Sequence, residues 1–337
     1  MTPLRVGIIG YGYTGKLHAR AFCAQPQAHL IAVCDSEKQH LQGLPEGIQT
    51  YESYEDLLAS NLDAVSICVP TYLHSKIAIQ ALASGKHVLI EKPIAANLEQ
   101  GHDMLNAAQA ANRILYVGMT HRFYPELREA KQLIDAGAIG SIVLCKDCIV
   151  EYLGFLNVPH WYLERTHAGG GVALTSGIHL IDRLCWFTGD DVEMVAGAAG
   201  NPYFGEDVED AAQIFLRFRG GCSAQITMAF LREQHPLLCD LEVIGTQGSI
   251  VVHTWQGYEI RNGSGRHERI FYTSEPHAAK VQVGVDGEVK EFCQSIIENR
   301  APWPSAQEST RALEVVMSYY SAVATGSALR LRGRDAV

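Results

Sequence analysis

The sequence predicts an α/β protein that begins with a doubly wound parallel sheet and continues into an α+β domain with a large, mostly antiparallel open sheet. A glycine-rich turn near the N-terminus lies between an apolar run and a helical segment. Short, continuous apolar runs then alternate with helical segments over the first third of the chain, as in a parallel sheet covered on both faces. After Ala136 the strand patterns lengthen and alternate between apolar and polar residues, which indicates antiparallel pairing.

Apolar spacing predicts the individual elements, and we place the domain boundary after residue 120. Strands of the first domain are expected at Val6–Ile9, Leu30–Cys34, Ala64–Val69, His87–Ile90 and Leu115–Gly118. Its helices are expected at Lys16–Gln25, Tyr54–Ala59, Lys76–Ser84 and Leu98–Ala111. In residues 121–337, strands are expected at Ser141–Val150, Gln213–Arg219, Cys222–Leu231, Leu241–Gly245 and Ser249–Trp255. Helices there are expected at Pro125–Ala136, from the triple glycine to Phe187, at Val289–Glu298 and at Ala306–Ala324.

Length and composition are those of an ordinary globular protein. The chain of 337 residues can bury a large core, with 47% apolar and 19% charged residues. A net charge of −10 argues against a nucleic-acid or anionic-membrane partner. No apolar run is long enough to cross a membrane, and the first strand begins too soon to leave room for a signal peptide.

The nine cysteines are odd in number and scattered, which favours reduced thiols and a cytoplasmic location over a disulfide framework. Cys145 and Cys148 have C-x-x-C spacing but lie on a predicted strand, where an odd separation points side chains to opposite faces. We therefore expect no metal site.

The turn Gly10–Gly15 matches the G-x-G-x-x-G fingerprint in its required context of strand, turn and helix. Gly10 permits the tight turn, Gly12 lets the backbone approach a pyrophosphate, and Gly15 lets the helix pack closely on the strand. The N–H groups at the start of the helix then face the phosphates. This predicts a Rossmann dinucleotide-binding domain in residues 1–120, with cofactor contacts from Gly10, Tyr11, Gly12, Tyr13, Thr14 and Gly15.

Asp35 ends the second predicted strand, twenty residues after Gly15. A carboxylate at this place accepts hydrogen bonds from the adenosine ribose hydroxyls and repels a 2′-phosphate. The next residues, Ser36 and Glu37, include no arginine that could pair with that phosphate. We therefore expect NAD rather than NADP, the alternative being an aspartate that merely opens a loop.

Two further loops end strands of the same predicted sheet. Glu91, Lys92 and Pro93 follow the fourth strand, and a lysine there can stabilise a developing alkoxide and relay a proton. A solvated surface lysine is the alternative, and the bond to Pro93 is either cis or trans. Pro70, Thr71 and His74 follow the third strand and, like Glu91 and Lys92, are expected along the cofactor, although His74 could simply begin a helix.

A third group of polar residues lies in the helix predicted after the triple glycine at residues 169–171, where we expect a bulky ligand to approach the backbone. Thr175 and Asp182 stand four residues before and three after His179, so the three side chains would share one stripe. His179 can take and return a proton near neutral pH. The alternative is a histidine that Asp182 satisfies at a domain interface.

The motifs together resemble the Gfo/Idh/MocA oxidoreductases, a family that includes glucose–fructose oxidoreductase and inositol 2-dehydrogenase. The resemblance rests on the glycine fingerprint, Pro70-x-x-x-His74, Glu91-Lys92-Pro93, the segments 121–125 and 139–142, and the triple glycine through Gly177-x-His179-x-x-Asp182. It implies a sugar, polyol or related substrate, and a homodimer or homotetramer formed through the C-terminal sheet.

The resemblance also implies roles for single residues. Lys92 would polarise the reacting oxygen, His179 would be the acid/base group, and Asp182 would bind substrate hydroxyls or orient His179. Many dehydrogenases of this family have an aspartate four residues before the histidine, where this chain has Thr175. Thr175, Arg122 and Trp161 are further candidates for the substrate pocket, although Trp161 could equally belong to the core.

The sequence thus predicts an NAD-dependent enzyme that transfers a hydride between nicotinamide and a secondary alcohol or ketone of a sugar, polyol or sugar-derived acid. One alternative is an NAD-dependent glycoside hydrolase that oxidises, eliminates and reduces again. Another is a non-catalytic sensor of NAD(H).

Overall fold

The computed structural model describes residues 2–153 and 159–331, and the chain divides into two compact units. The first unit comprises Met1–Thr120 and Val281–Thr310, and the second comprises His121–Lys280 and Arg311–Val337. Among the described residues, no helix combines the length and the apolar character needed to cross a bilayer.

The first unit contains a six-stranded sheet in the order β3-β2-β1-β4-β5-β6, and every pair in it is parallel. Its strands are β1 (Leu4–Ile9), β2 (Ala28–Cys34), β3 (Gln49–Tyr51), β4 (Ala64–Ile67), β5 (His87–Ile90) and β6 (Leu115–Val117). The expected doubly wound sheet is therefore confirmed. The sequence missed β3, because this three-residue strand at the sheet edge is polar and has no buried residue.

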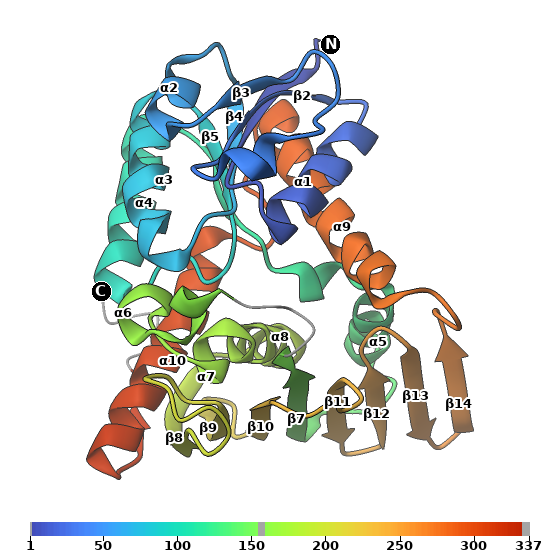
Figure 1. The fold of residues 1–337 in the computed structure, drawn as a ribbon. Helices are drawn as coiled ribbons and strands as arrows, with labels where there is room; N and C mark the ends of the chain where they lie inside the picture. The colour runs from blue at the N-terminus through green and yellow to red at the C-terminus, as the bar shows by residue number, and fades with distance from the viewer. Residues whose placement is uncertain (1, 154–158, 332–337) are drawn as a thin grey trace. The chain divides into compact units, whose positions relative to one another are not determined.

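Helices cover both faces of this sheet (Figure 1), α1 and α9 on one side and α3 and α4 on the other. They are α1 (Tyr13–Ala24), α2 (Tyr54–Ala59), α3 (His74–Ala83), α4 (Leu98–Ala111) and α9 (His277–Glu298). The sequence predicted the bounds of α4 because both ends carry local signals. Asn97 caps its N-terminus by accepting from the amide of Gln100, and Asn112 ends it in the left-handed conformation.

The segment 281–310 folds with the first unit although it lies far along the chain. In α9, Val285, Val289 and Phe292 are buried, and the Phe292 ring stacks on Tyr116 of β6 with centroids 6.2 Å apart. The helix also begins twelve residues earlier than the expected Val289. The expected division after residue 120, with NAD binding before it and substrate binding and oligomerisation after it, stays a prediction.

The second unit contains a nine-stranded sheet in the order β14-β13-β12-β11-β7-β10-β9-β8-β15. Its strands are β7 (Ile142–Tyr152), β8 (Val192–Gly200), β9 (Ala211–Phe218), β10 (Ser223–Leu231), β11 (Leu238–Gly245), β12 (Gly248–His253), β13 (Gly257–Asn262), β14 (Gly265–Ile270) and β15 (Leu329–Arg330). Only β7 and β10 pair in parallel, so the expected mostly antiparallel sheet is confirmed.

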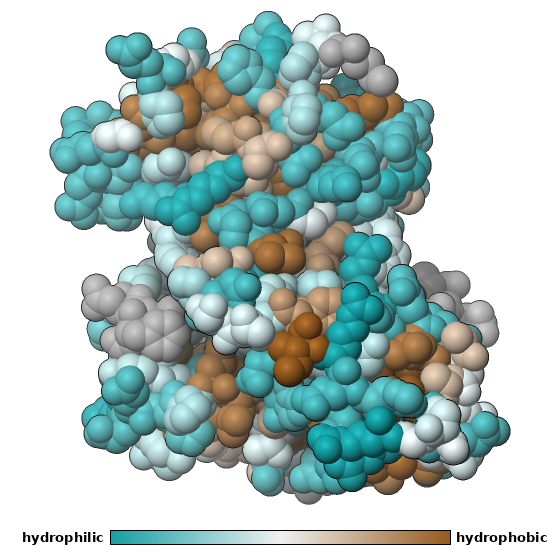
Figure 2. All heavy atoms as spheres, turned by 90° about the vertical axis from the view of Figure 1, so that its right-hand side faces the viewer, coloured by the Kyte–Doolittle hydropathy of each residue, from teal (hydrophilic) through white to brown (hydrophobic). Residues whose placement is uncertain are grey.

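Helices cover one face of this second sheet (Figure 1). Those that contact its strands include α5 (Pro125–Asp135), α7 (Val172–Thr175), α8 (Gly177–Thr188) and α10 (Ala306–Thr325). The outermost strand β14 carries Arg266, Glu268 and Arg269, and such charges oppose pairing with another chain. Figure 2, seen from the side of β14 and α9, shows hydrophobic residues in several separate areas among hydrophilic ones.

The packing of α9 predicts that replacing Phe292 with alanine will destabilise the first unit. Loss of a fully buried phenylalanine costs about 3–5 kcal/mol in the free energy of unfolding. Hydrogen exchange followed by mass spectrometry should show faster exchange in β5 and β6 and unchanged exchange in β9 and β10. Val283→Ala, at a half-exposed position of the same helix, is the control, and equal acceleration in both sheets would contradict the prediction.

Candidate active site

The glycine turn connects β1 to α1, and each glycine has its own physical reason. Gly10 adopts a positive φ of 90°. A Cβ at Gly15 would lie 2.0 Å from the carbonyl oxygen of Gly10, so only glycine allows this close packing. A Cβ at Gly12, in contrast, would meet no protein atom within 4 Å. No described protein atom therefore requires a glycine at this position, and the space beside it is open to a ligand.

The start of α1 suits a phosphate. Gly12 provides no side-chain cap, and the first turn contains no acidic residue that would occupy its N–H groups. Asp35, at the end of β2, accepts from the amides of Tyr11 at 2.6 Å and Glu37 at 2.8 Å. These bonds hold the carboxylate beside the turn. Oδ2 also lies 3.2 Å from Nδ1 of His40, while Oδ1 keeps a lone pair for a ribose hydroxyl. The residues present therefore fit a dinucleotide.

Lys92 follows β5 by two residues and is half-buried. The Lys92–Pro93 bond is cis. Glu91, immediately before it, donates its amide to Ile67 of β4 at 3.0 Å. Burial by itself would raise the pKa of Glu91, but His18 and the Lys92 charge outweigh that effect and lower it. Lys92 thus belongs to a network of charges rather than to the open surface.

His74 connects the loops that follow β4 and β5. It is the first residue of α3 and is buried, with Nδ1 2.9 Å from the Pro93 carbonyl and Nε2 3.0 Å from the Val69 carbonyl. Burial lowers the pKa of His74, so the neutral ring donates to one carbonyl at a time. The ring therefore holds the chain in place beside Lys92. Cofactor contacts from Pro70, Thr71 and His74 stay a prediction.

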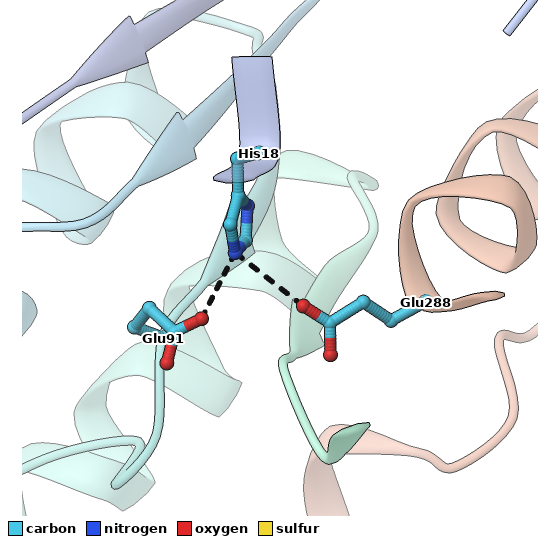
Figure 3. Close-up of side chains that lie close together, drawn as sticks. All are labelled: His18, Glu91 and Glu288. Carbon is cyan, nitrogen blue, oxygen red and sulfur yellow. Dashed lines mark hydrogen bonds and ion pairs between the residues drawn. The ribbon is translucent and has the colours of Figure 1, made fainter. Parts of the chain in front are cut away.

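Glu91 also forms a cluster with His18 and Glu288, which are both fully buried, while Glu91 is partly exposed (Figure 3). Nε2 of His18 is 2.9 Å from Glu91 Oε1 and 3.4 Å from Glu288 Oε1, while Nδ1 is 2.8 Å from the Ser66 hydroxyl. The sequence offered no signal for Glu288, which reaches the cluster from α9. His18 stands three residues after Gly15 and faces the sheet, a position that helical spacing from the fingerprint could have indicated.

In the second unit, the helix expected to run without interruption to Phe187 breaks at Ser176, giving α7 and α8. The Thr175 hydroxyl donates to the Gly171 carbonyl at 2.8 Å, within its own turn. The expected continuous stripe of Thr175, His179 and Asp182 is therefore interrupted, because Thr175 and His179 lie on different helices.

The triple glycine serves packing within the second unit. A Cβ at Gly171 would lie 1.9 Å from the carbonyl oxygen of Glu209, and a Cβ at Gly170 would lie 2.1 Å from the Tyr320 hydroxyl. The Glu209 carboxylate in turn accepts from the amides of Gly171 and Ala173. Protein atoms therefore account for these two glycines, where the sequence suggested a bulky ligand.

Asp182 forms a buried, bidentate ion pair with Arg122. The guanidinium donates to both carboxylate oxygens at 2.8 Å, and both side chains are at most 2% exposed. The Arg122 guanidinium also lies over the Trp186 ring, 5.6 Å from its centroid. Arg122 and Asp182 are both candidates for the substrate pocket, and the structure brings them together. They bind each other, however. Their binding of substrate stays a prediction.

The His179 ring is 7% exposed and stacks on His121, with centroids 4.4 Å apart and planes within 9°. His121 Nδ1 lies 3.4 Å from the Arg183 guanidinium, which forms a second buried ion pair with Asp147 of β7. Burial raises the pKa of Asp147 to about 6, although Arg183 opposes this effect. His179 is therefore largely buried and stacks on a histidine that lies beside the paired Arg183 guanidinium.

Trp161 lies in a single 3-10 turn, His160–Leu163, and is half-buried with its ring edge-on to Tyr162 at 5.5 Å. Its place in the substrate pocket stays a prediction. The first unit thus brings together the glycine turn, Asp35 and Lys92 at one edge of its sheet. The second unit brings together His179, Asp182 and Arg122.

Comparisons with known proteins agree with both units. Residues 4–119 match the model of the GFO/IDH/MocA oxidoreductase family, NAD-binding Rossmann fold, and residues 127–251 match that of the GFO/IDH/MocA C-terminal domain. D-glucoside 3-dehydrogenase of Escherichia coli is 32% identical over 56% of this chain and 55% of its own length. The NAD(+)-named scyllo-inositol 2-dehydrogenase of Bacillus subtilis is 26% identical over 97% and 96%.

A solved structure shares the fold over almost the whole chain. The myo-inositol 2-dehydrogenase of Lactobacillus plantarum superposes with a TM-score of 0.86 at 23% identity, covering 98% of this chain and 100% of the other. The two matched models follow one another along the sequence in the order of the two folds described above. This chain belongs to the GFO/IDH/MocA family of oxidoreductases, with an NAD-binding Rossmann fold.

Proposed function

We propose that this protein is an NAD-dependent dehydrogenase or reductase acting on a secondary alcohol or ketone of a sugar, polyol or sugar-derived acid. The observation that carries the proposal is Lys92 at the same sheet edge as the glycine turn and Asp35. That edge, at the carboxyl ends of the strands, is where doubly wound sheets bind their ligands. Relatives named for glucoside and inositol dehydrogenation support the substrate class.

The residues divide the work as follows. When bound, the nicotinamide supplies the hydride acceptor or donor. Lys92 donates a hydrogen bond to the reacting oxygen and stabilises its negative charge. His179 takes the hydroxyl proton or returns it. Thr175 carries no charge and cannot assist His179 as a carboxylate would, so Lys92 bears more of the electrostatic work.

Activity assays separate this function from its rivals. The protein is incubated with NAD and a panel of polyols, sugars and glycosides, while NADH absorbance and aglycone release are followed. Net NADH formation supports a dehydrogenase. Aglycone release without net NADH would indicate a hydrolase that oxidises its substrate transiently. Any substrate-dependent turnover would exclude a non-catalytic sensor.

The assignment of Lys92 predicts that Lys92→Ala will lower kcat by about 10²–10³-fold, as expected for loss of a preorganised donor. The dissociation constant for NAD, measured by fluorescence titration, should stay within a few-fold, because the glycine turn and Asp35 remain. Lys290→Ala, at an exposed lysine of the same unit, is the control. Retained turnover in the Lys92 variant would refute the assignment.

The carboxylate of Asp35 predicts the choice of cofactor. Asp35→Ser removes the charge that repels a 2′-phosphate, so the ratio of kcat/KM for NAD to that for NADP should fall by about 10–100-fold. Steady-state kinetics with both cofactors measures the ratio. Asp56→Ser is the matched control, and an unchanged ratio in the Asp35 variant would leave cofactor choice to another residue.

We further propose that the open face of the nine-stranded sheet forms a homodimer or homotetramer, and that the protein works in the cytoplasm. Phe215 is 43% exposed and lies in register with Gln225 and Lys146 across neighbouring strands of this face. An exposed phenylalanine on an open sheet face suits a self-complementary interface. The nine cysteines are all free, as in a reducing compartment.

Phe215→Glu should therefore reduce the oligomer to a smaller species in light scattering coupled to size-exclusion chromatography. The new carboxylates would be buried against like charges of the second copy. Val283→Glu, at an exposed apolar position of α9, should leave the mass unchanged. An identical mass for wild type and Phe215→Glu would place the interface elsewhere.

A further inference from the structure

Glu288 is a buried carboxyl group that the reaction does not use directly. It lies on α9 in the first unit and is completely excluded from solvent. Among the described atoms, neither of its oxygens has a hydrogen-bond partner, although Oε1 lies 3.4 Å from Nε2 of His18. A buried carboxylate without donors is strongly disfavoured, so this group requires either its own proton or a cation.

The surroundings of Glu288 contain a second carboxyl group and one imidazole. Figure 3 shows Glu91 and Glu288 pointing toward the same nitrogen of His18. The three polar atoms lie within 4.8 Å of one another. Glu288 is fully buried, whereas 16% of the Glu91 side chain is exposed. If both carboxyl groups were ionised, Glu288 would hold its charge beside a second carboxylate and without a hydrogen-bond donor, whereas a neutral Glu288 leaves His18 and Lys92 to balance Glu91. This arrangement favours one neutral carboxyl group.

Geometry identifies which carboxyl group is neutral. Nε2 of His18 forms a hydrogen bond with Glu91 at 2.9 Å, and Nδ1 is directed at Ser66 at 2.8 Å, so both ring nitrogens are engaged. Glu91 thereby accepts a hydrogen bond from the His18 ring, while Glu288 lies farther away, at 3.4 Å. Both carboxyl groups also lie close to Gly118. A Cβ at that position would be 3.2 Å from the Glu288 oxygens and 3.3 Å from Glu91 Oε1.

The ionisation of the cluster agrees with this arrangement. Burial, together with the charge of Glu91, raises the pKa of Glu288 well above its usual value, and His18 and Lys92 oppose the shift. Burial lowers the pKa of His18, but its contacts with Cys68 and Glu91 outweigh this and raise it. The remaining titratable neighbours are therefore Lys92, Cys68 and His74.

We propose that Glu288 is a positioning residue that keeps its proton at neutral pH and, with a cationic His18, holds the Glu91 carboxylate directly behind Lys92. Residues 91–93 are then held from both sides, since His18 bonds the Glu91 side chain and His74 bonds the Pro93 carbonyl. The proposal rests on the function of Lys92 proposed above. An ionised Glu288 would compete with Glu91 for His18 and release this segment.

Stability as a function of pH tests the proton directly, in the full-length protein and without substrate. Above the ordinary pKa of glutamate, the unfolded chain releases this proton and the folded chain keeps it, so the folded state loses stability as pH rises. Glu288→Gln mimics the protonated group and removes this dependence. The folding equilibrium constant of the variant, relative to wild type, should rise about tenfold per pH unit between about pH 5.5 and 7.5.

Glu298→Gln, at an exposed position of the same helix, is the matched control and should give a flat ratio. A flat or falling ratio for Glu288→Gln would show that Glu288 is ionised and overturn the proposal. If Glu288→Gln does not fold, a measurement on the wild-type protein alone tests the proposal. Calorimetric unfolding at neutral pH in buffers of different ionisation enthalpy must then show release of the Glu288 and His18 protons, and no net release would refute the proposal.

Kinetics distinguish positioning from a merely structural role. At neutral pH, Glu288→Gln should retain kcat within a few-fold, whereas Glu288→Ala should lose at least about tenfold in kcat with KM for NAD little changed. Equal loss in both variants would contradict a neutral Glu288.

Retained turnover in Lys92→Ala would refute the role of Lys92 but leave the pH dependence of stability as it is. A stoichiometric divalent metal in purified wild type, absent from Glu288→Gln, would replace the proton with a metal ion and overturn the proposal.

Discussion

Parallel pairing of β1 with β2 and β4 is the constraint on which the first unit depends. It places the ends of these strands, and of β5 beyond them, at one edge of the sheet. The glycine turn, Asp35 and the Lys92 loop are therefore neighbours although they are separated by up to eighty residues of chain. Side-chain bonds then complete the arrangement, because His74 connects two of the loops and His18 holds Glu91.

The second unit positions its polar residues with buried ion pairs instead. Arg122, in the turn before α5, binds Asp182 of α8, and Arg183 of α8 binds Asp147 of β7. Removing one member of such a pair leaves an uncompensated charge, which costs several kcal/mol. The setting of His179 is thus rigid because each neighbouring charge has its partner. Glu209 plays a comparable role for the glycines that precede α7.

Local signals account for most of what could be predicted. Continuous apolar runs located five of the six parallel strands, and apolar residues at helical spacing located α2 and α4. The errors occurred where tertiary contacts override local pattern. Ser176 interrupts a helix that spacing alone extends to Phe187, and the glycines at 170 and 171 accommodate Tyr320 and Glu209 rather than a ligand. Neither neighbour can be identified from sequence distance.

The sequence by itself determined the fold class, the family and the cofactor class, because these follow from glycine spacing and the period of apolar residues. Only the tertiary structure decided which charges meet. Glu288 reaches His18 from a helix some 270 residues along the chain, and Asp182 pairs with Arg122 rather than with its helical neighbour. The physical reason is that a buried charge is stable only beside an opposite charge. Which opposite charge lies close enough is decided by the folded structure and not by distance along the chain.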